Sequence, residues 1–333
     1  MRAICCLLTF LMLCQPQAFA WSDAGHKIVA SIAFRRLTSE EQAKVIEILR
    51  NHPRFATDFT MRMPNGISSA GEATKNDWAF QQAAVWPDIM RPPGPAAETA
   101  FHRGEWHYIN LPHFLDEASR TALANGLDLN LERDPPADAT EETRHMNAIQ
   151  AIRLAREKCA DPAVDDETRG VLLAWLFHLV GDIHQPLHST ALFSQNLFPE
   201  GDKGGNGVDT EQRGNLHALW DQLPGRSMNY SAARNRAIEL ANDEGLMAIG
   251  ESAAAQLDEE TWLNESHQAA VSVVYGPEVF SALRVQELSG GDVEFPPLDL
   301  SEDYFVAGRQ VANRRLVQAG YRLGAVLKEI VAE

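Results

Sequence analysis

The residues of this sequence with the most chemical potential lie in one short run, from His178 to His188, which contains three histidines and one aspartate. The apolar stretch before it, Val171–Phe177, predicts a buried helix, and Pro186 should end that helix at or just before Gln185. His178 and Asp182 are four residues apart, so their side chains should leave the same helix face one turn apart. A buried imidazole and carboxylate need a partner, and either a divalent metal ion or a mutual hydrogen bond would provide one.

A second pair with the same spacing, His217 and Asp221, follows a predicted helix cap at Asn215. Two such pairs on separate helices favour a metal site, although His–Asp pairs at this spacing also occur as ordinary solvated contacts. Further candidate ligands are scattered along the chain, namely His26, Asp88, His107 and His188. His184 points to another face of the central helix, which favours a structural hydrogen bond for it.

The elements that must position these residues are predicted to be helical almost throughout. Apolar periodicity and capping residues predict helices over 22–36, 39–50, 76–85, 140–158, 171–185, 215–221, 232–243, 259–274 and 303–331. We interpret 51–74, 91–97 and 201–207 as loops, the last of them flexible, and 105–110 as a short extended segment. Strand patterns are few and no repeat is present, so we expect a single compact all-α domain.

The first residues have the pattern of a secretory signal peptide. Arg2 precedes a short apolar run, and Ala18-Phe-Ala20 matches the small-residue cleavage pattern. We therefore expect residues 1–20 to be removed and a mature domain over 21–333 that begins at Trp21, secreted or periplasmic. No stretch is long and uncharged enough to predict a membrane span.

Composition excludes some kinds of partner and of stabilisation. The net charge of −17 argues against a nucleic-acid binder that works through a basic surface. Three of the four cysteines lie in the expected signal peptide, so Cys159 has no partner for an internal disulfide. Stability must then come from the core and from bound metal.

The sequence resembles the zinc-dependent nuclease family typified by the single-strand-specific fungal nucleases S-one and P-one. The segments that carry the resemblance are Trp21 with Gly25-His26, Trp86-x-Asp88, Trp106-His107-Tyr-Ile-Asn110, the run from His178 to His188, Gly204-Gly-Asn206, Asn215-Leu-His217-x-x-Trp-Asp221 and Ala319-Gly-Tyr-Arg-Leu-Gly. They occur in the family's order and span essentially the whole mature chain. The family has a multi-helix all-α fold that it shares with bacterial zinc phospholipase C.

The resemblance implies a site of three zinc ions. The first zinc would be held by Asp88, His107, His178 and Asp182, and the second by His188, His217 and Asp221. The third would be held by His26, by Asp182 again, and by the α-amine and carbonyl oxygen of Trp21. A free α-amine has a pKa of roughly 7.7–8.0 and can lose its proton to a metal near neutral pH. Cleavage after Ala20 would create that amine, so we expect the uncleaved precursor to be inactive.

The resemblance also implies a reaction and the residues that serve it. Zinc ions sharing Asp182 would activate a water for in-line attack on phosphorus, and the remaining zinc would stabilise the leaving 3′-oxygen, giving 5′-phosphate products. Asp88, Asp182 and Arg91 would be catalytic, with Arg91 contacting phosphate. Tyr108 would stack on a base, although core packing is an alternative for it. Asn110 replaces an acid that binds the base edge in the fungal enzymes, and Asn206 would contact phosphate or merely shape its loop.

We therefore expect an exported, monomeric endonuclease that acts on single-stranded DNA and RNA and on 3′-nucleotides, with no stable protein partner. A zinc phospholipase C is the nearest alternative; there a Glu stands where this chain has Asp221, which favours the nuclease. A non-catalytic periplasmic zinc-binding protein is the alternative from another class. The sequence leaves base preference, pH optimum and duplex activity open.

Overall fold

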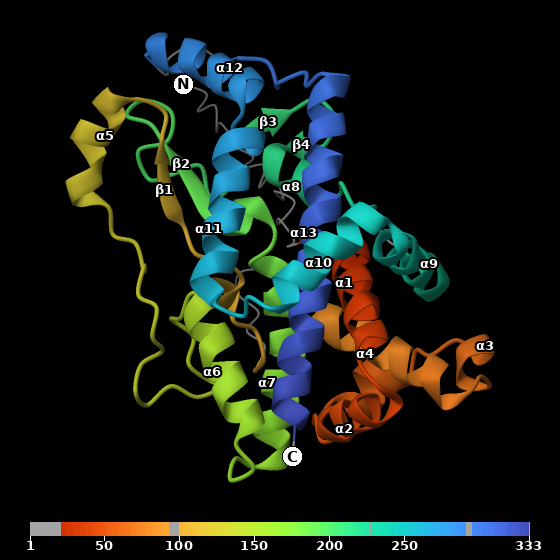
Figure 1. Cartoon of the computed structure of the whole chain (residues 1–333). Coiled ribbons are helices and arrows are strands. Elements are labelled where there is room, and N and C mark those ends of the chain that lie inside the picture. The colour runs from red at the N-terminus through yellow and green to blue at the C-terminus, as the bar shows by residue number, and fades with distance from the viewer. Residues whose placement is uncertain (1–20, 93–99, 227, 291–294, 333) are drawn as a thin grey trace, which may run out of the picture.

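The computed structural model describes residues 21–92, 100–226, 228–290 and 295–332, and its regular structure is almost entirely helical, which confirms the all-α class (Figure 1). The expected signal peptide and residues 93–97 of an expected loop lie outside the described residues. The α-helices are α1 (Asp23–Arg36), α2 (Ser39–Arg50), α3 (Asn65–Ser68), α4 (Glu72–Ile89), α5 (Glu117–Leu123), α6 (Ala148–Ala160), α7 (Asp166–Asp182), α8 (Leu216–Asp221), α9 (Tyr230–Asn242), α10 (Glu244–Ala254), α11 (Glu259–Ala269), α12 (Pro277–Leu288) and α13 (Glu302–Val331). Short 3₁₀ or π helices are η1 (Phe55–Thr60), η2 (Gly104–His107), η3 (Ala124–Gly126), η4 (Pro186–His188) and η5 (Ala270–Val274), and the strands are β1 (Leu111–Phe114), β2 (Thr190–Phe193), β3 (Asp209–Thr210) and β4 (Gly214–Asn215). No described helix combines the length and apolar character needed to cross a membrane.

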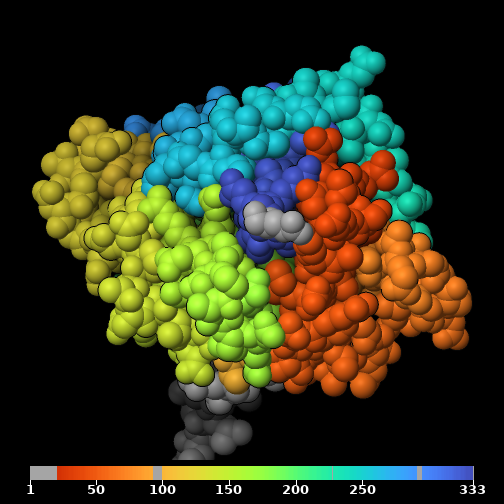
Figure 2. Space-filling model, turned by 60° about the horizontal axis from the view of Figure 1, so that its bottom comes forward, coloured from red at the N-terminus to blue at the C-terminus, as the bar shows by residue number. Residues whose placement is uncertain are grey.

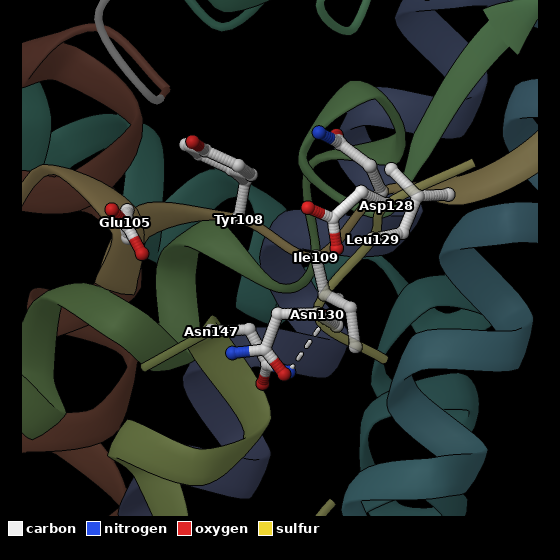
Figure 3. Close-up of a pocket in the computed structure, with 8 residues that line it drawn as sticks. Glu105, Tyr108, Ile109, Asp128, Leu129, Asn130 and Asn147 are labelled. Carbon is white, nitrogen blue, oxygen red and sulfur yellow. Dashed lines mark hydrogen bonds between the residues drawn. The ribbon is translucent and has the colours of Figure 1, made fainter. Parts of the chain in front are cut away.

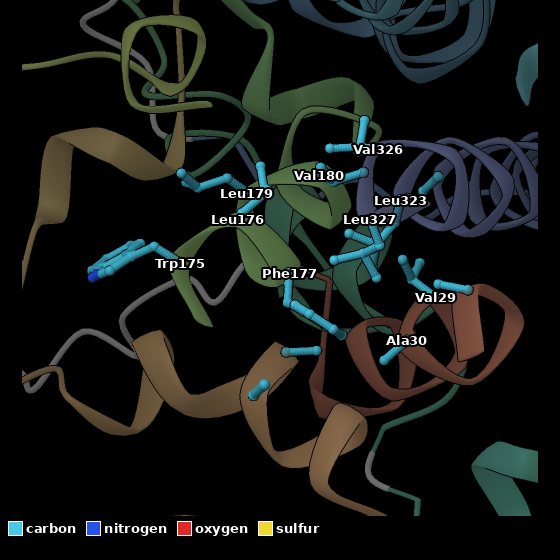
Figure 4. Close-up of a cluster of buried hydrophobic side chains, with 14 of the residues drawn as sticks. Val29, Ala30, Trp175, Leu176, Phe177, Leu179, Val180, Leu323, Val326 and Leu327 are labelled. Atoms are coloured by element: carbon cyan, nitrogen blue, oxygen red, sulfur yellow. The ribbon is translucent and has the colours of Figure 1, made fainter. Parts of the chain in front are cut away.

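The buried helix α7 lies at the centre of the fold, as its apolar sequence predicts. Asp165 caps its first turn by accepting a hydrogen bond from Thr168 N, and every residue from Gly170 to Asp182 is buried. Its side chains meet those of α1 and α13 in one hydrophobic cluster (Figure 4). Each large apolar side chain buried there contributes about 1.5–3 kcal/mol to the stability of the fold. The apolar part of α7 therefore fixes the position of its last turn, which carries the polar residues.

Glycines allow α1 to approach both α7 and α13 closely. A Cβ at Gly181 of α7 would lie 2.6 Å from His26 Nδ1, and a Cβ at Gly320 of α13 would lie 2.5 Å from Ile32 Cβ. In the space-filling view of Figure 2, α13 (blue) comes to the surface between the red N-terminal helices and the green α6–α7 region. The N-terminal helix is therefore locked against the central helix and the C-terminal helix.

Two strands tie the segments after His107 and His188 together. β1 and β2 are parallel, with Leu111 opposite Thr190. The pairing continues upstream, because Ile109 N donates to His188 O at 2.8 Å. His188 Nδ1 also donates to the His107 carbonyl, so two histidines 81 residues apart in the chain are held side by side.

Two expected helix boundaries are wrong. The helix expected over 76–85 is α4, which begins at Glu72 and continues through Pro87 to Ile89; Pro87 cannot donate a hydrogen bond to the Ala83 carbonyl, and the helix ends two residues later. The helix expected from Thr140 begins only at Ala148, because Asn147 forms a capping box with Gln150.

The loop expected over 51–74 contains η1 and α3, and the expected extended segment 105–110 begins within η2. Three further α-helices were not expected at all, namely α5, α10 and α12. α10 follows α9 after a single residue, Asp243, which ends one helix and caps the next. α12 starts at Pro277, a favoured first position of a helix.

Candidate metal centre

The last turn of α7 provides the centre of the site. His178 Nε2 lies 3.1 Å from Asp182 Oδ2, one helical turn away. His178 Nδ1 donates to the Ala84 carbonyl of α4 at 2.7 Å, which fixes the ring and leaves Nε2 facing the carboxylate. The helix ends at Asp182, and Ile183 follows as its C-cap, in agreement with the expected stop before Gln185.

The end of α4 and the segment at η2 bring two more side chains to this point. His107 Nδ1 lies 2.9 Å from Asp182 Oδ2 and 3.0 Å from His178 Nε2. Asp88 Oδ1 lies 3.8 Å from His178 Nε2. Asp88, His107 and His178 have ligand atoms close enough to one another to hold one metal ion.

A second group forms where η4 meets α8. The Nε2 atoms of His188 and His217 lie 3.2 Å apart, and Asp221 Oδ2 is 3.5 Å from His217 Nε2. Asn215 caps α8 as expected, by accepting from Ala218 N. His188, His217 and Asp221 form another set that could hold a metal ion.

The third group involves the start of the described chain. His26 stacks on His178 with ring centroids 4.0 Å apart, and His26 Nε2 lies 3.4 Å from Asp182 Oδ1. Among the described residues, His26, His178 and Asp182 are the third set that could hold a metal ion. Trp21 is buried against Gly25, and the hydrogen bond from Ser22 N to Asp221 O keeps it near the second group.

Several buried polar atoms of the site make no hydrogen bond. They are both ring nitrogens of His26, Nε2 of His107, Oδ1 of Asp182 and Oδ2 of Asp221. Each buried polar atom left unpaired costs about 1–3 kcal/mol, so a cluster of them in a well-packed region needs a further partner. Imidazole nitrogens and carboxylate oxygens together suit a divalent transition metal such as Zn²⁺. The residues present fit bound metal ions.

The pKa values of His26 and His107 favour the metal-binding form, whereas at His178 burial is outweighed by the charges of Asp182 and Asp88, which raise the pKa. Burial, and after it the charge of His178, lowers the pKa of His26. Burial, and after it the charge of Arg91, lowers the pKa of His107 to about 3. Both imidazoles are therefore neutral at physiological pH, and a neutral ring has a lone pair to give to a metal.

The pKa values of Asp182 and Asp221 shift in opposite directions. Burial alone would raise the pKa of Asp182, but His178 and His188 outweigh it and hold that pKa well below its ordinary value. Burial raises the pKa of Asp221 well above its ordinary value, and the hydrogen bond from Gln185 only partly offsets this. A cation bound beside Asp221 would reverse the direction by stabilising the carboxylate.

The residues expected to contact substrate lie around these groups. Arg91 Nη2 is 3.0 Å from Asp88 Oδ1. Tyr108, directly after His107, has 40 % of its surface exposed, so it is not a core residue. Asn110 is half-buried and lines a small pocket together with Tyr108. Asn206 Nδ2 donates to Lys203 O at 2.7 Å, so this amide helps to shape its own loop.

Sequence reasoning missed the residues that support the ligands. Gln185, fully buried, donates to Asp221 Oδ1 at 2.8 Å and accepts from Leu187 N at 2.6 Å. His217 Nδ1 donates to the Gly204 carbonyl at 2.6 Å. Gln185 lies inside the run that attracted attention first, but spacing gives no sign of its partner, 36 residues later.

The loop 201–207, expected to be flexible, is anchored through a buried aspartate. Asp202 accepts hydrogen bonds from Leu192 N, Gly205 N and the Tyr275 hydroxyl, at 2.6–3.0 Å. Burial raises the pKa of Asp202 to about 6. Gly204, with φ of +62°, passes so close to Leu187 O that a Cβ would lie 2.5 Å from it. These hydrogen bonds and the close contact with Leu187 hold the loop in one position, from which the Gly204 carbonyl contacts His217.

The structure also places His184 as expected, with Nδ1 donating to Val180 O at 2.7 Å and Nε2 accepting from Arg322 Nη1 at 2.9 Å.

Comparison with known proteins points to one family. The family model described as S1/P1 Nuclease matches residues 21–332. Endonuclease 4 of Arabidopsis thaliana is 29% identical over 327 residues, which cover 94% of this chain and 90% of the relative. Nuclease S1 of Aspergillus oryzae is 27% identical over 323 residues, which cover 95% of this chain and 93% of the relative. With a match across nearly all of its length, the chain belongs to the S1/P1 nuclease family and is a hydrolase of phosphodiester bonds in nucleic acid.

Proposed function

We propose that this protein is an exported zinc-dependent endonuclease that cleaves single-stranded DNA and RNA to 5′-phosphate products and also removes phosphate from 3′-nucleotides. The observation that carries the proposal is the closeness of the three potential metal sets: two of them share His178, and in the third, His188 Nδ1 lies 3.9 Å from Asp182 Oδ1. The Asp182 carboxylate lies within 3.4 Å of a ring nitrogen of His26 and of a ring nitrogen of His107. Sets this close to one another favour a compact cluster of three zinc ions over isolated structural ions.

The chain's own residues would divide the work as follows. Asp88, His107, His178 and Asp182 would hold the first zinc, His188, His217 and Asp221 the second, and His26, Asp182 and the Trp21 terminus the third. Bound zinc would supply an acidified water and positive charge opposite the phosphate oxygens. Arg91, held by Asp88, would contact the phosphate, and the exposed ring of Tyr108 would stack on a base.

The metal cluster would also explain how an acidic protein attracts an anionic substrate. The chain has a net charge of −17, so its surface repels nucleic acid overall. A local cluster of divalent cations would provide the attraction at the point of cleavage only. Unpaired strands are flexible enough to bring a single phosphate into such a recess, which supports a preference for single-stranded substrate.

We further propose that residues 21–333 form one monomeric nuclease domain, released to the periplasm or the medium by cleavage of a signal peptide between Ala20 and Trp21. Trp21 is buried beside the second metal set, although the first residue of a folded domain usually lies at the surface. A terminal α-amine acting as a ligand would account for that burial.

The deciding experiment compares substrates on the mature protein with and without a chelator. We expect cleavage of single-stranded DNA, RNA and 3′-AMP, with close to three zinc ions per chain by metal analysis, and no release of phosphocholine from phosphatidylcholine. Activity on phosphatidylcholine alone would identify a phospholipase instead. One zinc or none in active protein would refute the trinuclear centre.

A pair of histidine variants controls the experiment. His217→Ala removes a buried member of the second set and should abolish hydrolysis while helicity is retained. His267→Ala removes a half-buried histidine that belongs to none of the metal sets and does not line the pocket at Tyr108, and it should leave hydrolysis unchanged. Equal activity in the two variants would refute a role for the second set.

A further inference from the structure

A small pocket opens beside the metal sets, on the outer side of the segment that carries His107. Its volume is ≈ 170 Å³, and its lining, much of it drawn in Figure 3, consists of Glu105, Tyr108, Ile109, Asn110, Asp128, Leu129, Asn130 and Asn147. The same backbone forms the pocket and the site, since Tyr108 follows His107 and Ile109 N donates to His188 O. A group bound in this Tyr108 pocket would therefore adjoin a phosphate held by the metal sets.

The chemistry of the lining excludes a phosphate as the occupant. It contains two carboxylates, Glu105 and Asp128, and no lysine or arginine. It also contains a tyrosine ring that is 40 % exposed. A carboxylate-lined pocket with an aromatic wall favours a flat group that donates hydrogen bonds, and in a nuclease that group is a base.

Three of the six polar side chains in the lining already have partners. Asn147 Nδ2 donates to Glu132 O at 2.8 Å and to Asn130 O at 3.1 Å, while its Oδ1 caps α6. Asn130 Nδ2 donates to Gln150 Oε1 at 2.9 Å. These amides hold the segment that carries Asp128 against the start of α6, so the wall of the pocket is fixed before any ligand binds.

Glu105 is also engaged, because its Oε1 lies 3.0 Å from His145 Nδ1. Of the lining side chains with polar ends, Tyr108, Asn110 and Asp128 make no side-chain hydrogen bond or ion pair within the described residues. In Figure 3 the Asp128 carboxylate extends into the space between the Tyr108 ring and the Asn130–Asn147 pair. Asp128 is exposed, and its carboxylate is thus available as an acceptor for a base that stacks on Tyr108.

We propose that Asp128 determines the base preference of this nuclease and selects guanine; the inference rests on the proposed function. A carboxylate accepts hydrogen bonds and donates none. The Watson–Crick edge of guanine has two adjacent donors, N1–H and the N2 amine, which match the two carboxylate oxygens. Adenine and cytosine offer one amine beside an acceptor nitrogen. Thymine offers one N–H between two carbonyl oxygens, and a carboxylate repels both of these oxygens.

The other lining groups would not produce this order. Stacking on Tyr108 is tolerant of sequence because every base has a π-face. The Asn110 amide both donates and accepts, so it can pair with any of the bases. The expected preference is guanine first, adenine and cytosine next, and thymine or uracil last.

The test uses deoxydinucleotides in which each base in turn stands on the 5′ or the 3′ side of the cleaved phosphate. Thymine occupies the other position in every substrate. We expect wild-type kcat/KM to favour guanine over thymine by about tenfold on one of the two sides, in keeping with a bidentate base contact. Asp128→Asn, which places an amine against the guanine donors, should reduce that ratio to near one. Asp128→Ala, which removes the acceptor without adding a donor, should do the same.

A matched control separates recognition from simple charge. Asp138 is exposed on the same segment and does not line the pocket. Asp138→Asn removes the same charge and should leave the guanine-to-thymine ratio unchanged, even if it raises kcat/KM for all substrates.

The ratio compares substrates on one preparation, so partial unfolding of a variant does not alter it. Cleavage by the wild type without base preference, or an unchanged ratio in both Asp128 variants, would overturn the inference and leave the proposed function standing. Wild-type protein that cleaves no single-stranded substrate at all would overturn both.

Discussion

Gln185 offers a sharp test of how the second metal set is held. Its side chain is fully buried and bridges Asp221 Oδ1, at 2.8 Å, and Leu187 N, at 2.6 Å. Asp221 is thereby turned so that Oδ2 faces His217. Replacing Gln185 by Met keeps the length and volume of the side chain and removes both hydrogen bonds.

The size of the effect follows from these contacts. Gln185→Met leaves two buried groups unpaired, at about 1–3 kcal/mol each, so the free energy of unfolding of the metal-free protein should fall by about 2–6 kcal/mol. Loss of an orienting partner typically weakens metal binding by about 10–100-fold. We expect a loss of that size for one metal ion per chain, with the other ions retained.

The assay is a chelator competition that resolves the successive dissociation of the metal ions, beside urea unfolding of the metal-free protein. Gln81→Met is the matched control, because Gln81 is also fully buried and donates to Ser31 Oγ at 2.8 Å without touching a proposed ligand. It should lose stability and keep all metal affinities. If Gln185→Met also keeps them, then Gln185 does not orient Asp221 and the reasoning is wrong.

Three further predictions concern the terminus, the packing and the pH dependence. One residue added before Trp21 should reduce kcat at least tenfold if the terminal amine is a zinc ligand, which steady-state assays on precisely processed and extended protein would check; equal rates would exclude the amine. Gly181→Ala puts a Cβ 2.6 Å from His26 Nδ1, so it should lower the free energy of unfolding by about 1–3 kcal/mol and weaken metal binding, and an unchanged Tm would contradict the close approach of α1 and α7. Because the pKa of Asp202 is raised from 3.8 to about 6, its contribution to stability is fully present below pH 3.8 and is lost as the pH rises through 6. Compared with Asp202→Asn, the metal-free wild type should lose about 3 kcal/mol of unfolding free energy across that interval, measured by urea unfolding at each pH.

The parts of the fold that the sequence predicts well are those fixed by local interactions. The run Val171–Phe177 is apolar on all sides, and such a helix can only be buried. The caps at Asn215 and the stop before Gln185 depend on neighbouring residues alone. The start of α6 was misjudged because residues 140–147 have a helical pattern, whereas Asn147 uses its side chain and its neighbours to begin the helix later.

The site was predictable only in part from spacing. The pairs His178–Asp182 and His217–Asp221 lie one turn apart on their helices, so local geometry brings them together. His26, Asp88 and His107 come from distant elements, and only the resemblance to a family assigns these candidate ligands to the same site. The anchored loop at Asp202 was missed because its partners, Leu192 N and Tyr275, lie 10 and 73 residues away in the chain.

The parallel pairing of β1 with β2 has a consequence for when the protein can become active. His107 and His188 are brought together by backbone bonds that form only after the whole of α6 and α7 has been synthesised between them. His26 is close to Asp182 only once α1 has docked. A chain kept extended for transport across a membrane would hold no preassembled fragment of this centre, so the cell that makes it would be spared its activity until folding is complete.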